Sequence, residues 1–127
     1  MEGLSPLEQA ALDKLIAGDH PVLQTLRHLA SRASLRAKEY TGVGVFCSFD
    51  VLPGTPTVAG GFELEDVTAE VAGFNHGAGF ILFVREGVIE LLEGFSYDEP
   101  WPDEIRDFEI AYVHEPRLLP DPRTSGN

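Results

Sequence analysis

The sequence predicts an α+β domain, with two N-terminal helices packed on one face of a roughly five-stranded antiparallel sheet. Apolar residues recur at helical spacing up to about residue 34, and from Leu35 onward they alternate with polar residues as in strands. Clusters of glycine and proline separate the later segments. Helices that precede a run of strands favour an α+β fold, with the helices on one side of the sheet.

The first helix is predicted over residues 6–17. Ser5 suits the N-cap position, Glu8 completes a capping box with it, and Gly18 ends the helix. A second apolar stripe of helical period predicts another helix over residues 20–34.

The alternation over residues 35–51 predicts one long first strand, with Glu39 on the same face as its apolar residues. The next strand, near residues 62–71, changes phase and therefore needs a bulge close to Asp66. The apolar run over residues 80–84 lacks alternation, which predicts a central strand covered on both faces.

Glu86 and Gly87 predict a hairpin turn into a strand over residues 88–97, and residues 108–112 alternate as a last strand. The length of 127 residues fits one domain. We expect that domain over residues 1–115 and a disordered, polar and proline-rich tail over residues 116–127.

Charge is the strongest compositional signal. The formal net charge is −12, and residues 39–115 hold 16 acids against Arg85 and Arg106, a local net charge of −14. Such an anionic field repels phosphate backbones and anionic lipids, so we expect neither nucleic acid nor a membrane as partner. The same field attracts basic proteins. A net charge of this size also serves solubility alone.

The first residues lack the basic and apolar regions of a signal peptide, so we expect no secretion by an N-terminal signal. The longest apolar run is far short of the roughly 20 residues that span a bilayer. The single cysteine, Cys47, cannot form an internal disulfide, which suits a reducing cytoplasm, where we expect the protein. Its place in the apolar phase of a strand favours packing over nucleophilic chemistry. The histidines have no metal-ligand spacing, and we expect no metal or cofactor.

Two carboxylates break the apolar pattern, Glu39 in the first strand and Glu93 between Leu91 and Phe95. A carboxylate in an apolar setting has a raised pKa and can act as a general acid or base. Alternatively, each lies near a sheet edge or pairs with a base. The sequence does not say whether the two meet.

The segment 73–79 places Asn75 and His76 on a glycine-rich turn. His76 is the best single catalytic candidate, since a histidine transfers protons near neutral pH and exposed turns often carry function. The glycines are equally explained by turn geometry.

Trp101, the only tryptophan, stands between two prolines in an acidic loop. An anchor for a basic partner has this composition, because tryptophan is enriched at interface hot spots and acids steer a basic protein. The acids of this candidate partner-binding loop are Asp98, Glu99, Asp103 and Glu104. Alternatively, the indole folds back to seal the end of the sheet.

Residues 79–84, residues 91–95 and the pair Trp101-Pro102 resemble segments of small uncharacterised bacterial proteins, including immunity proteins of polymorphic toxin systems. The resemblance covers residues 62–115 and contains no catalytic motif. It implies a small, acidic, non-enzymatic protein that neutralises a toxin by occupying its active site.

The leading hypothesis is a cytoplasmic, non-enzymatic binding protein that uses an acidic sheet or loop surface against a basic protein partner. One alternative is a small hydrolase or isomerase that uses His76 with Glu39 or Glu93. Another is a small-ligand pocket between the helices and the sheet, lined by Phe and Tyr. The sequence does not indicate an oligomeric state.

Overall fold

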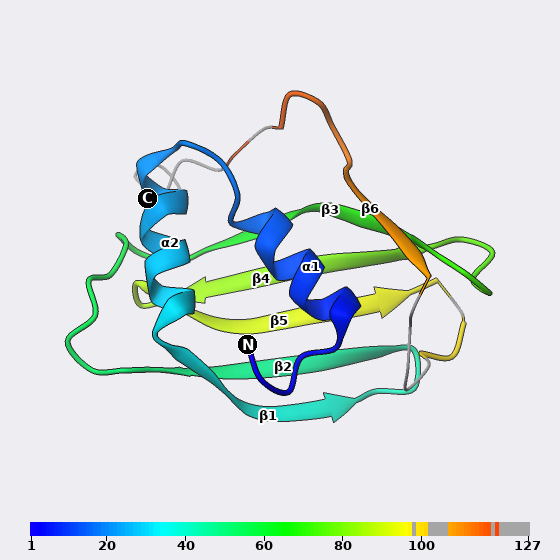
Figure 1. The fold of residues 1–127 in the computed structure, drawn as a ribbon, viewed down its shortest axis with the longest axis horizontal. Coiled ribbons are helices and arrows are strands. Elements are labelled where there is room, and N and C mark those ends of the chain that lie inside the picture. The colour runs from blue at the N-terminus through cyan, green and yellow to red at the C-terminus, as the bar shows by residue number, and fades with distance from the viewer. Residues whose placement is uncertain (98, 102–106, 118, 120–127) are drawn as a thin grey trace.

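A computed structural model of the chain describes residues 1–97, 99–101, 107–117 and 119. It confirms the α+β class, with six strands rather than five (Figure 1). The elements are α1 (Pro6–Leu15), α2 (Pro21–Ser31), β1 (Ala33–Tyr40), β2 (Gly44–Val51), β3 (Phe62–Val71), β4 (Ala78–Arg85), β5 (Val88–Ser96) and β6 (Phe108–Tyr112). All strand pairs are antiparallel, in the order β1-β2-β5-β4-β3-β6.

Helix α1 begins at Pro6 as predicted, α2 begins one residue later than predicted, and both helices end earlier than predicted. The capping box of α1 is present, because Ser5 Oγ accepts from the Glu8 amide at 3.2 Å and Glu8 Oε1 accepts from the Ser5 amide at 2.9 Å. Helix α2 ends at Ser31 rather than Ser34, because the chain enters β1 at Ala33.

The predicted single strand over residues 35–51 is wrong: this segment forms the β1–β2 hairpin. The chain turns at Gly42, whose φ of +92° lies in the left-handed region that glycine adopts without strain, and the Thr41 amide donates to the Gly44 carbonyl at 2.9 Å. A second irregularity, a bulge between Leu35 and Ala37, reverses the facing of the rest of β1.

Two other local predictions are confirmed. The register of β3 against β4 shifts between Leu64 and Val67, which is the bulge expected near Asp66. The β4–β5 hairpin turns at Glu86 and Gly87, and both have positive φ, 51° and 85°, as a two-residue type I′ turn requires.

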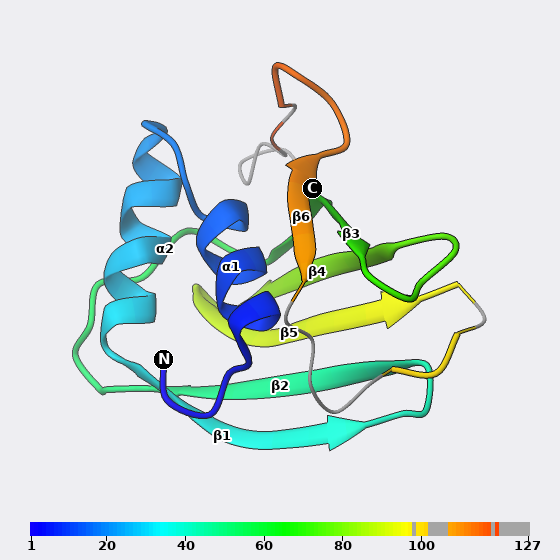
Figure 2. The same ribbon diagram turned by 45° about the vertical axis from the view of Figure 1, so that its right-hand side comes forward.

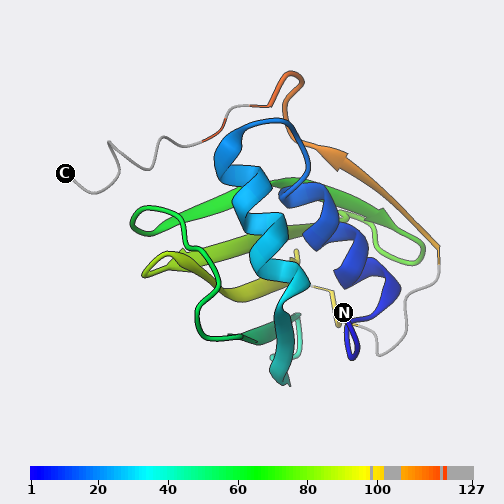
Figure 3. The ribbon, with the colours of Figure 1, turned by 60° about the vertical axis from the view of Figure 1, so that its left-hand side comes forward.

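Both helices lie across the same face of the sheet (Figures 1 and 3). They enclose the hydrophobic core, in which Leu7, Leu15, Leu26 and Leu29 of the helices are fully buried. The sheet twists strongly, so that β6 runs at a steep angle to β1 (Figure 2).

Strand β4 is interior to the sheet, as predicted, but it is not covered on both faces. Its residues alternate between buried ones on the helix side and partly buried ones on the other side. The cause is the placement of both helices on one face, which leaves the opposite face without a covering element in the described part of the chain.

Arg117, which the sequence pattern assigns to the tail, is bound to the domain. Its guanidinium donates to both carboxylate oxygens of Asp66, at 2.7 and 2.8 Å, and to the carbonyls of Leu15 and Ala17, both at 3.0 Å. It therefore joins β3 to the C-terminal end of α1. Residues 118 and 120–127 of the predicted tail lie outside the described residues.

Neither α1 nor α2, at 10 and 11 residues, has the length and apolar character needed to cross a membrane, and the described residues contain no longer helix.

Candidate functional site

The sheet face turned away from the helices, which we call the open face, carries a group of partly buried apolar side chains. They are Phe46, Ile81, Phe83, Leu91 and Phe95. Phe95 lies over Gly79 of the neighbouring strand, where a Cβ atom would come within 2.5 Å of its ring. The absence of a side chain at residue 79 thus leaves room for the end of the Phe95 ring over β4.

Carboxylates surround this apolar group. The cross-strand register places six acidic residues on the open face: Glu39, Asp50, Glu63, Glu70, Glu93 and Glu109. Two bases pair with two of them, Arg36 with Asp50 at 3.5 Å and Arg85 with Glu63 at 2.9 Å. No described base lies within ion-pair distance of the other four. One of these, Glu93, lies among the apolar side chains, opposite Phe46 and Ile81, and the others lie on the outer strands β1, β3 and β6.

Glu39 and Glu93 lie on the open face in one cross-strand row, with Phe46 between them. Glu39 is directly opposite Phe46, and Phe46 is directly opposite Glu93. Residues directly opposite in antiparallel strands share a face, and two strand spacings separate the outer pair by about 10 Å between Cα atoms. The sequence singled out both carboxylates, but the aromatic residue between them follows only from the register.

Glu39 is therefore not in the apolar core phase that the sequence pattern assigned to it. The bulge between Leu35 and Ala37 turns Glu39 to the open face, where it is exposed, and turns Lys38 toward the helices. Glu93 shares its face with Leu91 and Phe95 as expected, but that face is the open one. Glu39 and Glu93 stand two strands apart, with Phe46 on the strand between them.

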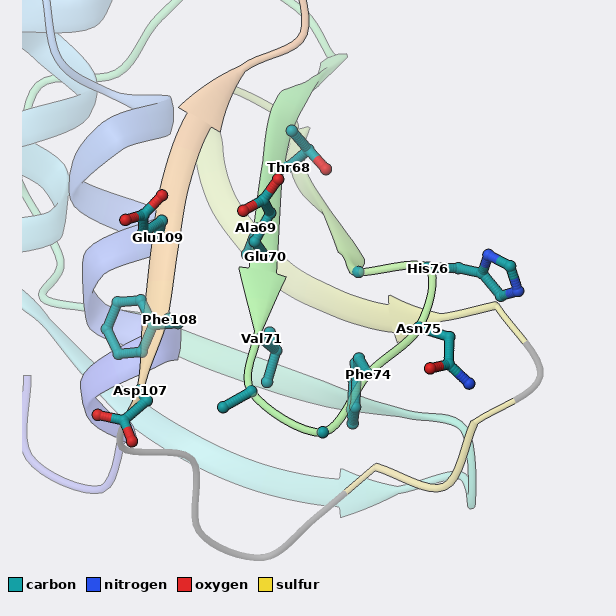
Figure 4. Close-up of a pocket in the computed structure, with 13 residues that line it drawn as sticks. Thr68, Ala69, Glu70, Val71, Phe74, Asn75, His76, Asp107, Phe108 and Glu109 are labelled. Atoms are coloured by element: carbon teal, nitrogen blue, oxygen red, sulfur yellow. The ribbon is translucent and has the colours of Figure 1, made fainter.

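His76 lies in the turn between β3 and β4 and lines a surface pocket of about 950 Å³. This pocket holds neither Glu39 nor Glu93; its acidic residues are Glu70, Asp107 and Glu109. In Figure 4 the imidazole of His76 and the amide of Asn75 point away from these carboxylates. Neither carboxylate that the enzyme hypothesis combines with His76 lines the pocket beside it.

Glu99 of the predicted partner-binding loop is used within the protein. Its carboxylate oxygens accept hydrogen bonds from the backbone amide of Asn75, at 2.8 and 3.0 Å, and one of them also accepts from the backbone amide of His76 at 3.2 Å. This contact ties the segment after β5 to the β3–β4 turn.

Trp101 packs into the end of the core and is 8% exposed. Its ring makes edge contacts with Phe74 and Phe80, at centroid distances of 6.1 and 6.0 Å, and covers Gly94. Its amide donates to the Gly42 carbonyl at 2.8 Å. A partner could reach the indole only if this segment moved away. Asp98, Asp103 and Glu104 lie outside the described residues.

Cys47 is fully buried, and burial raises the pKa of its thiol to about 12. A thiol that stays protonated at neutral pH is a poor nucleophile, so Cys47 is a packing residue. Among the described residues, no group of three His, Cys, Asp or Glu side chains has the geometry of a metal site.

Core side chains of the helices and the sheet pack against each other in the space between them. The Phe- and Tyr-lined ligand pocket stays a prediction. A groove of about 650 Å³ runs between α1 and α2, and neither Phe nor Tyr is among the residues that line it.

A scan against protein-family models gives no match, and searches of the curated proteins and of the solved structures give none either. The resemblance to immunity proteins stays a prediction.

Proposed function

We propose that this chain is a non-enzymatic binding module whose open sheet face holds a basic protein partner. The observation that carries the proposal is the composition of that face, with partly buried apolar side chains and Glu93 at its centre and further carboxylates without a described base on its outer strands. Protein interfaces commonly combine an apolar centre with a polar rim. The anionic rim favours a partner that presents Arg or Lys around an apolar surface.

The open face fits this role better than the loop around Trp101. The indole of Trp101 is buried in the core, and the carboxylate of Glu99 is engaged by two backbone amides. An immunity protein that occupies the active site of a basic toxin would be one module of this kind.

Site-specific photocrosslinking in the native cell tests the proposal. A benzoylphenylalanine in place of Ser48, which lies on the open face between Ala37 and Leu91, should capture a basic protein. The control places the same crosslinker at Gln24, which is exposed on α2. Thermal unfolding of both variants checks that each one folds.

Capture of a basic protein from position 48 and not from position 24 supports the proposal. With the captured protein purified, added salt should slow association, because the Debye length falls from about 10 Å at 0.1 M to about 3 Å at 1 M. Capture only through position 24, or capture of an acidic protein, would overturn the proposal.

A further inference from the structure

The row Glu39–Phe46–Glu93 places an aromatic ring between two carboxylates on the open face. Phe46 is partly buried, and it lies on the open face because its strand neighbours Val45 and Cys47 point into the core. The carboxylates come from the strands on either side, β1 and β5.

The same face contains an occupied version of this arrangement. The guanidinium of Arg85 lies over the ring of Phe83, 5.2 Å from its centroid, and donates to Glu63 Oε1 at 2.9 Å. Glu63 is the residue directly opposite Phe83 in the neighbouring strand. A phenylalanine with a glutamate directly across from it thus accommodates a guanidinium on this surface.

Phe46 has a glutamate directly opposite it in each of its two neighbouring strands, and no described cation lies over its ring. The nearest basic residues of β1 are used elsewhere, because Arg36 pairs with Asp50 and Lys38 pairs with Glu8 on the helix side. The carboxylates of Glu39 and Glu93 have no described base within 4.0 Å.

We infer that Glu39, Phe46 and Glu93 form a binding site for an arginine side chain of the basic partner. The inference rests on the proposed function of the open face. A planar guanidinium stacked on Phe46 directs its N–H groups sideways, toward carboxylates on both flanks. An ammonium is a compact, strongly hydrated charge without this planar fork, so the site prefers arginine to lysine.

Fluorescently labelled hexa-arginine and hexa-lysine peptides, compared by anisotropy at low salt, test this preference. Both should bind, because both carry the same charge to an anionic surface. Hexa-arginine should bind about 2- to 5-fold more tightly, the factor expected of an exposed cation–π contact. Amide shifts in heteronuclear NMR should show both peptides on β2 and β5.

Three variants distinguish specific binding at this site from the general electrostatic attraction of the anionic surface. Phe46→Leu should bring the affinity ratio of the two peptides close to one. Glu93→Gln should weaken the binding of hexa-arginine more than Glu109→Gln does. Glu109→Gln removes an equal charge from the open face, but residue 109 stands opposite Glu70 rather than opposite an aromatic ring. Thermal unfolding confirms that each variant is folded.

An affinity ratio that Phe46→Leu leaves unchanged, or equal affinities in the unmodified protein, would overturn the arginine site while the proposed function stood. If neither peptide shifts the amides of β2 and β5 at low salt, the open face does not bind cations. That result would overturn both proposals.

Discussion

At the scale of single residues, Glu8 combines two roles that the sequence shows only in part. It is 2% exposed, and its carboxylate accepts from the Ser5 amide at 2.9 Å and pairs with Lys38 Nζ at 2.7 Å. The capping box could be predicted, because it depends on residues three apart. The ion pair could not, because the bulge that turns Lys38 toward the helices leaves no clear signal in the pattern.

The ion pair between Glu8 and Lys38 predicts a measurable coupling. Lys38→Met leaves a buried carboxylate without its charge partner and should lower the free energy of unfolding by about 2 kcal/mol. The double variant Glu8→Gln/Lys38→Met should recover part of this loss, because it removes both charges. Urea unfolding of the four proteins at pH 7 measures the coupling.

The pH dependence of this coupling has a defined sign. Burial lowers the pKa of Lys38, but the hydrogen bonds and charges of Glu8 and, to a smaller extent, of Tyr40 together outweigh it and raise the pKa above 10.5. The stabilisation is therefore complete below pH 10.5 and is lost as the pH rises through the folded-state pKa. A stability gap between the unmodified protein and Lys38→Met that stayed constant above pH 10.5 would contradict this account.

At the scale of elements, short-range signals predicted the hairpin at Glu86 and Gly87 and the bulge in β3, but not the β1–β2 hairpin. Both correct predictions depended on adjacent residues with strong turn or phase signals. In residues 33–51 the apolar alternation continues past the turn at Gly42, so that two strands had the appearance of one.

The β3–β6 pair contains a local conflict, because Glu70 and Glu109 are directly opposite. Like charges directly opposite in antiparallel strands repel each other. Glu109→Lys should therefore raise the free energy of unfolding by about 0.5 kcal/mol. Glu115→Lys, beyond the end of β6, changes the net charge equally without a cross-strand carboxylate and should have a smaller effect. Equal gains in urea unfolding would assign the effect to net charge alone.

At the scale of the whole molecule, the candidate site depends on contacts that no local pattern contains. Residues 39 and 46 meet through a hairpin turn, but residues 46 and 93 meet only because β2 pairs with β5. The same long-range order places both helices on one face and leaves the other open. The sequence therefore indicated two unusual carboxylates, but neither their common face nor the ring between them.

Arg117 offers a test of how the end of the described chain stabilises the whole domain. Arg117→Ala removes the contacts to Asp66 and to the carbonyls of Leu15 and Ala17, and should lower the free energy of unfolding by about 2–3 kcal/mol, because it leaves a largely buried carboxylate unpaired. Amide hydrogens of α1 should also exchange faster. The matched control is Arg36→Ala, whose exposed ion pair with Asp50 should contribute less than about 1 kcal/mol. If both variants lost the same small stability and exchange in α1 stayed unchanged, Arg117 would not hold α1 in place.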